Sequence, residues 1–157
     1  WKGLVGSEMC IRDRLTTEII KSNYVTNEKE NLVVSFDQIK KNILSKSFNV
    51  IDARSLERFE GKVSEPRKGL RSGHIQNSFC LPFNQCINQK TGEFKNLEEL
   101  RELFNQNENI EKRLDQVFTC GSGVTAAVLA YAYKMVNNDY IPKIYDGSWS
   151  EYGKYPA

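Results

Sequence analysis

A chain of 157 residues with 39% hydrophobic and 27% charged residues is typical of one globular domain, long enough to fold without disulfide bonds. A formal net charge of +2 and scattered basic residues argue against nucleic acid and anionic membranes as partners. No apolar run is long enough to span a bilayer, and we expect no secretory signal.

The cysteines exclude the common zinc sites. There are four, Cys10, Cys80, Cys86 and Cys120; none forms a Cys-x-x-Cys pair, and His74 is the single histidine. The sequence therefore predicts neither a metal site nor a cofactor. A low cysteine count fits a reducing compartment, so we expect a cytoplasmic protein, or a mitochondrial one if the source is eukaryotic.

The first 31 residues differ from the rest. Residues 1–14 show no periodicity and resemble translated sequencing-adapter text, so we expect them to be non-native. Residues 15–31 are polar and weakly patterned, and we expect them to be the remnant of a linker. Beyond them, residues 32–34 predict a short strand. Ser35 and Gln38 then form a capping box that predicts the start of a helix.

Short apolar runs predict strands at four further places in the chain. A charged loop, residues 61–73, separates the first of them from the second. The expected strands are residues 48–51, 79–81, 117–119 and 143–145. Strands that alternate with helices imply an α/β fold, with a mainly parallel central sheet covered by helices on both faces.

Helices are expected between these strands, each with a recognisable start. Asn96 predicts the cap of a helix that carries an apolar stripe of three residues. The stripe consists of Leu97, Leu100 and Phe104. The long apolar segment 124–135 predicts the next helix. Ser148 and Glu151 have the spacing of a second capping box near the end of the chain.

The junction between the strand 117–119 and the helix 124–135 is the most informative part of the chain. Cys120 stands there, in a loop that contains Gly121 and Gly123. Glycines allow successive N–H groups to form an anion-binding nest, and the helix N-terminus adds a partial positive charge. Both features favour the thiolate, which is the nucleophilic form of cysteine. Arg54 also follows a predicted strand and could face the same crevice as Cys120, but we expect Arg54 and Asp52 to join loops rather than to contact substrate.

Six motifs occur in one order and together resemble a known family. They are Asp52-Ala53-Arg54, Arg58-Phe59, Glu65-Pro66-Arg67, the Gly-Leu-Arg-Ser-Gly-His-Ile of residues 69–75, the Cys120 loop and the Asp-Gly-Ser-Trp-Ser-Glu-Tyr-Gly of residues 146–153. The chain resembles the C-terminal, catalytic domain of two-domain sulfurtransferases in the rhodanese superfamily, most of all the 3-mercaptopyruvate sulfurtransferases. The resemblance implies a rhodanese-like three-layer fold over residues 32–157, without the preceding rhodanese domain that completes the cleft in that family.

The resemblance also implies an activity. In such enzymes a cysteine thiolate takes sulfur from 3-mercaptopyruvate, keeps it as a persulfide and releases pyruvate. The sulfur then passes to a thiol acceptor, such as thioredoxin, or to cyanide. This places a persulfide on Cys120 and makes the reaction covalent, two-step catalysis.

Particular residues take roles through the same resemblance. Arg58 and Arg67 match the pair that holds the substrate carboxylate, a task suited to guanidinium groups. Gly121 and Ser122 match the loop of mercaptopyruvate enzymes, where thiosulfate enzymes carry Arg-Lys, and Ser122 is expected to assist the departing enolate as a catalytic residue. The loop amides are expected to hold the transferred sulfur. These substrate-binding residues are Gly121, Gly123, Val124 and Thr125.

Other interpretations remain open. In one alternative, the sulfur donor is thiosulfate and not 3-mercaptopyruvate. In another, the chain is a rhodanese-like module that carries a persulfide but has no activity by itself. A phosphatase with a cysteine loop would need an arginine where Ala126 stands. Single residues also have structural alternatives: an ion pair of Arg58 with Glu57 or Glu60, core packing for Cys80, an incidental loop thiol at Cys86, and a structural role for His74.

Overall fold

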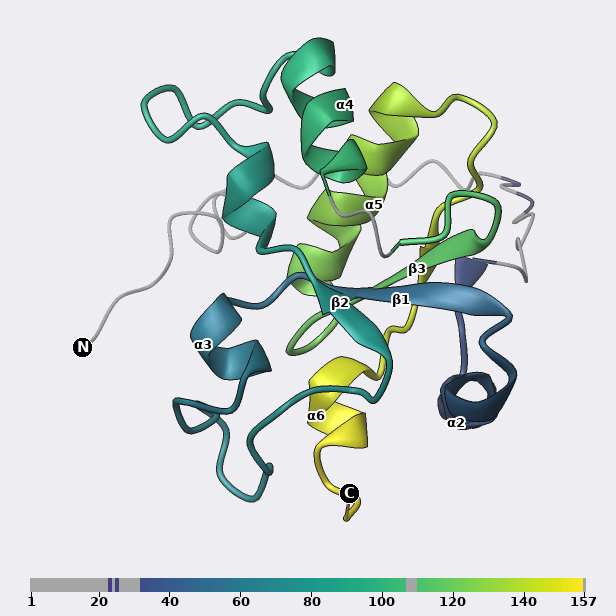
Figure 1. Cartoon of the computed structure of the whole chain (residues 1–157), viewed down its shortest axis with the longest axis vertical. Coiled ribbons are helices and arrows are strands. Elements are labelled where there is room, and N and C mark those ends of the chain that lie inside the picture. The colour runs from purple at the N-terminus through teal and green to yellow at the C-terminus, as the bar shows by residue number, and fades with distance from the viewer. Residues whose placement is uncertain (1–22, 24, 26–31, 107–109, 157) are drawn as a thin grey trace.

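The computed structural model describes residues 23, 25, 32–106 and 110–156, and a four-stranded sheet forms its centre (Figure 1). The strands are β1 Phe48–Asp52, β2 Ser78–Cys80, β3 Asp115–Thr119 and β4 Lys143–Ile144. They lie in the order β2-β1-β3-β4, and every neighbouring pair is parallel. The predicted parallel sheet is therefore confirmed, with β1 and β3 at its centre.

Helices cover both faces of this sheet. They are α2 Phe36–Ser45, α3 Leu56–Phe59, the 3-10 helix η2 Phe83–Cys86, α4 Leu97–Asn105, α5 Val124–Val136 and α6 Ser148–Tyr152. In Figure 1, α4 and α5 lie on one side of the sheet, and α2 and α6 lie on the other. The expected three-layer α/β arrangement is confirmed.

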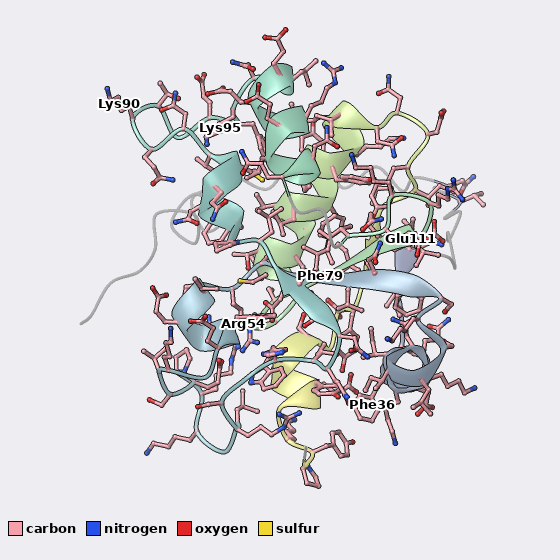
Figure 2. The ribbon with its side chains drawn as sticks, viewed as in Figure 1. Phe36, Arg54, Phe79, Lys90, Lys95 and Glu111 are labelled. Atoms are coloured by element: carbon pink, nitrogen blue, oxygen red, sulfur yellow. The ribbon has the colours of Figure 1, made fainter. Side chains whose placement is uncertain are left out.

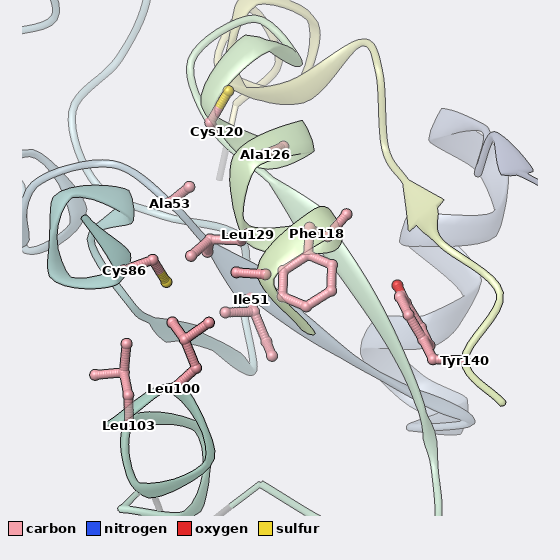
Figure 3. Close-up of a cluster of buried hydrophobic side chains, with 12 residues drawn as sticks. Ile51, Ala53, Cys86, Leu100, Leu103, Phe118, Cys120, Ala126, Leu129 and Tyr140 are labelled. Carbon is pink, nitrogen blue, oxygen red and sulfur yellow. The ribbon is translucent and has the colours of Figure 1, made fainter. Parts of the chain in front are cut away.

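Alternating side chains of the two central strands supply one core on each face. Ile51 and Phe118 are register partners and pack with α4 and α5 (Figure 3). Val50 and Val117, one position earlier in each strand, belong to a second cluster that includes residues of α2 and α6. Burial on both faces is what a parallel sheet requires, and it makes the central strands rigid supports for the residues that follow them.

The start of α2 follows local sequence rules. Ser35 accepts a hydrogen bond from the Gln38 N–H, and the Gln38 side chain accepts one from the Ser35 N–H, so the predicted capping box is confirmed. The strand expected at residues 32–34 is not formed. Val33 makes only an isolated parallel bridge with Ile144. The expectations for residues 1–14 and 15–31 lie outside the described residues, apart from positions 23 and 25.

The helix α4 confirms its predicted cap but not its whole apolar stripe. Asn96 and Glu99 form a reciprocal capping box, and Leu100 is fully buried. Leu97, in contrast, is 43% exposed, and Leu103 is buried in its place. The expectation for Leu97 was wrong because the first residue of the helix points away from the face that Leu100 and Leu103 share.

The predicted capping box at α6 is wrong. Ser148 does not precede the helix but is its first residue, and Gly147 occupies the capping position without a side-chain cap. The Glu151 carboxylate accepts a hydrogen bond from the Tyr145 hydroxyl at 2.7 Å instead of serving Ser148. The Ser148 side chain is turned into the protein, where it contacts residues of the Cys120 loop.

Candidate active site

The two central strands deliver their following residues to the same place. Asp52 and Thr119 are register partners at the ends of β1 and β3, and the Ala53 N–H donates to the Thr119 carbonyl at 2.8 Å. Arg54 and Cys120 therefore leave the sheet side by side. This is the carboxyl edge at which ligands bind in parallel sheets.

The Cys120 sulfur lies at one end of the α4–α5 core and is directed away from Leu129 and Phe118 (Figure 3). The residue is only 2% exposed. Its sulfur accepts a hydrogen bond from the Ser122 N–H at 3.4 Å. It also receives hydrogen bonds from the Thr125 side chain and from the amides of Thr125 and Ala126 in the first turn of α5. The predicted nest of loop amides around this cysteine is thus present.

Two opposing effects act on the pKa of the Cys120 thiol. Burial, the largest single effect, raises the pKa because it penalises the charged form. The hydrogen bonds from Thr125, Ser122 and Ala126 favour the thiolate and together outweigh burial, so the pKa lies below its ordinary value of 9.0. The loop therefore holds a thiol that ionises more readily than a free cysteine does.

Selective alkylation should reveal this difference between the cysteines. Burial raises the pKa of Cys80 to about 12 and that of Cys86 to about 11. A thiol ionises as the pH rises through its pKa. Because the pKa of Cys120 is lowered while those of the other two are raised, Cys120 forms its thiolate at a lower pH than Cys80 or Cys86. We expect iodoacetamide to label Cys120 first as the pH is raised, measured by peptide mass spectrometry. Earlier labelling of Cys80 or Cys86 would contradict this order.

Both predicted substrate arginines lie beside Gly121. The Arg67 Nη1 donates to the Gly121 carbonyl at 3.3 Å. A Cβ atom at position 121 would lie 3.1 Å from Arg58 Nη2 and 3.6 Å from Arg67 Nη1. The absence of a side chain at Gly121 thus allows two cations to approach the loop of the nucleophile. Their positive charges could hold a carboxylate there.

A buried carboxylate, Glu65, holds Arg58 in this position. Its side chain is 1% exposed and pairs with Arg58 Nη2 at 2.5 Å and with Arg54 Nη1 at 2.8 Å. The proposed surface partners Glu57 and Glu60 are therefore not those of Arg58, because the loop after α3 folds back and brings Glu65 over the helix. The Arg58 side chain remains 25% exposed and keeps part of its guanidinium free.

Arg54 does not face an open crevice. Its side chain is 0% exposed, and its guanidinium donates to both carboxylate oxygens of Asp52 and to the Gly73 carbonyl. It also lies over the Trp149 ring, with 4.4 Å from Cζ to the ring centroid. Figure 2 shows Arg54 at the end of β1, near α3 and α6. Arg54 therefore joins loops and does not contact a ligand at this edge.

The remaining predicted residues lie in the Cys120 loop and in the first turn of α5. Gly123 caps α5 with φ +81°, and Val124 begins the helix with 72% of its surface exposed. Thr125 hydrogen-bonds the sulfur, and Ser122 does so through its main chain. The catalytic role of the Ser122 hydroxyl stays a prediction.

Exchange of Gly123 for alanine is expected to deform this loop. A Cβ atom would lie 2.6 Å from Asp146 Oδ1 and 3.3 Å from the Asp146 carbonyl, at a left-handed φ. Gly92 has a similar φ of +75° but nothing within 4 Å of such an atom, so Gly92→Ala is the matched control. We expect Gly123→Ala to lower the free energy of unfolding by about 1–3 kcal/mol more than Gly92→Ala, measured by urea denaturation. Equal effects would show that the contact with Asp146 is unimportant.

Two of the structural alternatives are settled by contacts. His74 Nδ1 lies 2.9 Å from the Phe59 carbonyl, and its ring stacks on the Phe59 ring, which fits a structural role. Cys86 is not a loop thiol: it is 0% exposed, lies in η2 and belongs to the α4–α5 core. The interpretation of Cys86 failed because only the tertiary fold covers this short polar turn.

Two residues that organise the site, Glu65 and Ser148, were missed by sequence reasoning, which gave Glu65 no role and Ser148 only that of a helix cap. Both lie in motifs that carried the resemblance, so the signal was present in the residue types but not in any local pattern.

A cavity of about 340 Å³, lined by Gln116 and Arg101 among others, lies at the start of β3 and away from Cys120.

No helix within the described residues is both long and apolar enough to cross a membrane. The His, Cys, Asp and Glu side chains of the ranges 32–106 and 110–156 also form no group of three that could hold a metal ion.

A comparison with protein families decides what this arrangement is. The model of the rhodanese-like domain matches residues 35–155. The chain belongs to the rhodanese-like domain family. Its parallel sheet and helical layers are thus those of a rhodanese-like domain, and the three-layer fold expected from the resemblance is confirmed.

Several rhodanese-like proteins are similar to this chain. The mitochondrial thiosulfate/3-mercaptopyruvate sulfurtransferase 1 of Arabidopsis thaliana is 41% identical over 133 residues, which cover 85% of this chain and 34% of that protein. The human 3-mercaptopyruvate sulfurtransferase is 39% identical over 76% of this chain and 39% of its own length. The crystal structure of Tum1 from Saccharomyces cerevisiae has a TM-score of 0.75 at 27% identity, covering 87% of this chain and 48% of that one. The chain thus spans little more than a third of the length of these two curated relatives.

Proposed function

We propose that this chain is the catalytic domain of a sulfurtransferase that takes sulfur from 3-mercaptopyruvate, carries it as a persulfide on Cys120 and passes it to a thiol or to cyanide. One observation carries the proposal: a thiol with a lowered pKa lies in a nest of amides, and two arginines approach the next residue, Gly121. The printed names of the relatives point to the same chemistry.

The first half-reaction forms the persulfide. The Cys120 thiolate attacks the sulfur of 3-mercaptopyruvate, a sulfur–sulfur bond forms and the carbon–sulfur bond breaks. The bonding electrons leave with the three-carbon fragment as an enolate, which takes up a proton and becomes pyruvate. The substrate thiol loses its proton, so the persulfide is left as an anion. The Ser122 hydroxyl is placed in the loop from which that proton could be relayed to the enolate.

The second half-reaction transfers the outer sulfur of the persulfide from Cys120 to the acceptor. The thiolate of an acceptor attacks the outer sulfur, the bond to Cys120 breaks and its electrons restore the Cys120 thiolate. In both halves negative charge resides on sulfur next to the amides of Ser122, Thr125 and Ala126. Because these donors are already oriented, they stabilise that charge without reorganisation.

The arginines account for the choice of donor. A guanidinium binds a carboxylate through two parallel hydrogen bonds. The exposed Arg67 guanidinium donates to the Gly121 carbonyl through Nη1, and we assign its remaining N–H groups to the substrate carboxylate. Arg58, held by Glu65, adds a second positive charge for the keto oxygen. The proposed partners are a thiol acceptor such as thioredoxin and a preceding rhodanese domain that forms the opposite wall of the cleft. The proposed compartment is the cytoplasm or the mitochondrion.

Mass spectrometry after exposure to each donor tests the proposal. With 3-mercaptopyruvate we expect the Cys120 peptide to gain one sulfur atom while an equal amount of pyruvate is released. The human relative serves as the positive control. Faster sulfur uptake from thiosulfate would favour the alternative donor, and rapid hydrolysis of an aryl phosphate would favour a phosphatase. No sulfur on Cys120 with either donor would contradict the proposed function.

A further inference from the structure

The start of α6 is attached to the Cys120 loop through three consecutive residues. The Trp149 N–H donates to the Cys120 carbonyl at 2.9 Å, and the Ser150 N–H donates to the Gly121 carbonyl at 2.9 Å. The third contact, made by the Ser148 side chain, reaches both ends of the loop. Amide N–H groups at a helix start are free to donate to such carbonyls because they lack acceptors within the helix.

The Ser148 hydroxyl is fully occupied and fully buried. It accepts hydrogen bonds from the Cys120 N–H at 3.2 Å and from the Gly123 N–H at 3.0 Å, and it donates to the Tyr145 carbonyl at 2.8 Å. A serine hydroxyl offers one donor and two acceptor positions, so these three contacts already use its whole capacity. The Thr119 hydroxyl makes a further, longer contact with the same oxygen at 3.4 Å. Ser148 is 0% exposed, which means that water cannot replace the hydroxyl at low cost.

These contacts divide the amides of the loop between two acceptors. The N–H groups of Cys120 and Gly123 turn toward Ser148. Those of Ser122, Thr125 and Ala126 turn toward the sulfur. Each peptide plane is rigid, so fixing the amides at the two ends limits how the amide between them can turn.

The backbone of Ser148 points to the same role. Its φ is +50°, in the left-handed region that non-glycine residues avoid because their Cβ atom approaches the backbone too closely there. A serine keeps such a conformation where the surrounding contacts require it. Here the positive φ sends the side chain inward under the loop, instead of outward to cap α6.

We propose that Ser148 is a positioning residue for sulfur transfer: its buried hydroxyl holds both ends of the Cys120 loop so that the remaining loop amides face the sulfur. The reaction named here rests on the proposed function, whereas the arrangement of the loop can be measured without turnover.

Two substitutions separate this role from simple support of the fold. Ser148→Ala removes the hydroxyl and keeps the strained backbone, whereas Ser148→Gly removes the hydroxyl and relieves the strain. Ser78→Ala is the control, because it removes a half-buried hydroxyl that donates to the Ile75 carbonyl at 2.6 Å in β2, away from the loop. The pKa of Cys120 is read from the ultraviolet absorbance of its thiolate, as the difference from Cys120→Ser. Persulfide formation is followed in a single turnover with 3-mercaptopyruvate.

We expect the pKa of Cys120 to rise in both Ser148 variants and persulfide formation to slow by about 10- to 100-fold, with Ser78→Ala unchanged. A structural role alone predicts that Ser148→Gly behaves like the unchanged protein. An unaltered pKa in Ser148→Gly would overturn the proposal, even where Ser148→Ala does not fold. If the unchanged protein forms no persulfide but the pKa still rises in both variants, the positioning role stands and the proposed function fails.

Discussion

Replacement of Cys120 by serine is expected to abolish persulfide formation and to slow sulfur transfer from 3-mercaptopyruvate by about 10 000-fold or more. A serine hydroxyl stays protonated at neutral pH, and because serine has no sulfur atom it cannot form a persulfide. The other described cysteines cannot take over, because burial raises the pKa of Cys86 to about 11 and that of Cys80 to about 12. The measurement is the mass of each cysteine peptide after exposure to the donor, together with the rate of pyruvate release.

Cys80→Ser is the matched control for this experiment. The Cys80 thiol lies on β2 and contacts the Arg54 carbonyl at 3.7 Å, away from the loop amides. We expect this variant to retain the rate of the unchanged protein. Sulfur uptake that persists in Cys120→Ser, or that disappears in Cys80→Ser, would show that Cys120 is not the carrier.

Exchange of Glu65 for glutamine is expected to lower the free energy of unfolding by about 3–5 kcal/mol. The carboxylate is 1% exposed and pairs with both Arg54 and Arg58, so its removal leaves the two guanidinium groups with a single carboxylate, Asp52, which pairs with Arg54. The amide group of glutamine would also direct N–H groups at guanidinium donors. Because Arg58 loses its anchor, we further expect the KM for 3-mercaptopyruvate to rise. Urea denaturation and steady-state kinetics measure the two effects.

Glu60→Gln provides the comparison for Glu65. Glu60 pairs with Lys62 at 2.7 Å, but both side chains are exposed, by 37% and 68%, and such pairs contribute at most about 1 kcal/mol. We expect this variant to keep its stability and its KM. A Glu65→Gln protein that is no less stable than Glu60→Gln would refute the importance of the buried pair.

The features that could be predicted from the sequence are those set by neighbouring residues. The apolar runs of the strands and the polar cap of α2 act within a few positions of the chain, and the structure confirms them. The loop of Cys120 was also predictable, because glycines between a strand and a helix leave few other arrangements. Its pKa follows from that local geometry.

The errors arise where distant residues decide. Ser148 and Glu151 have the spacing of a capping box, but the Ser148 hydroxyl accepts a hydrogen bond from the Cys120 N–H, 28 positions earlier in the chain. Arg58 pairs with Glu65 and not with its nearer neighbours because the following loop folds back. Cys86 is buried only once α4 and α5 cover η2. No local pattern contains this information, since each contact depends on how separate elements pack.

Trp149 gives the molecule an optical sensor of its own site. The Arg54 and Arg71 guanidinium groups lie over its indole ring, with the two Cζ atoms 4.4 Å and 4.7 Å from the ring centroid. The main-chain N–H of Trp149 donates to the Cys120 carbonyl. Tryptophan emission responds to nearby charge and to exposure. The second tryptophan, Trp1, can be replaced by phenylalanine, so that Trp149 is the only source of tryptophan fluorescence. A change in this fluorescence on sulfur loading will then show whether the contacts between α6 and the Cys120 loop are altered.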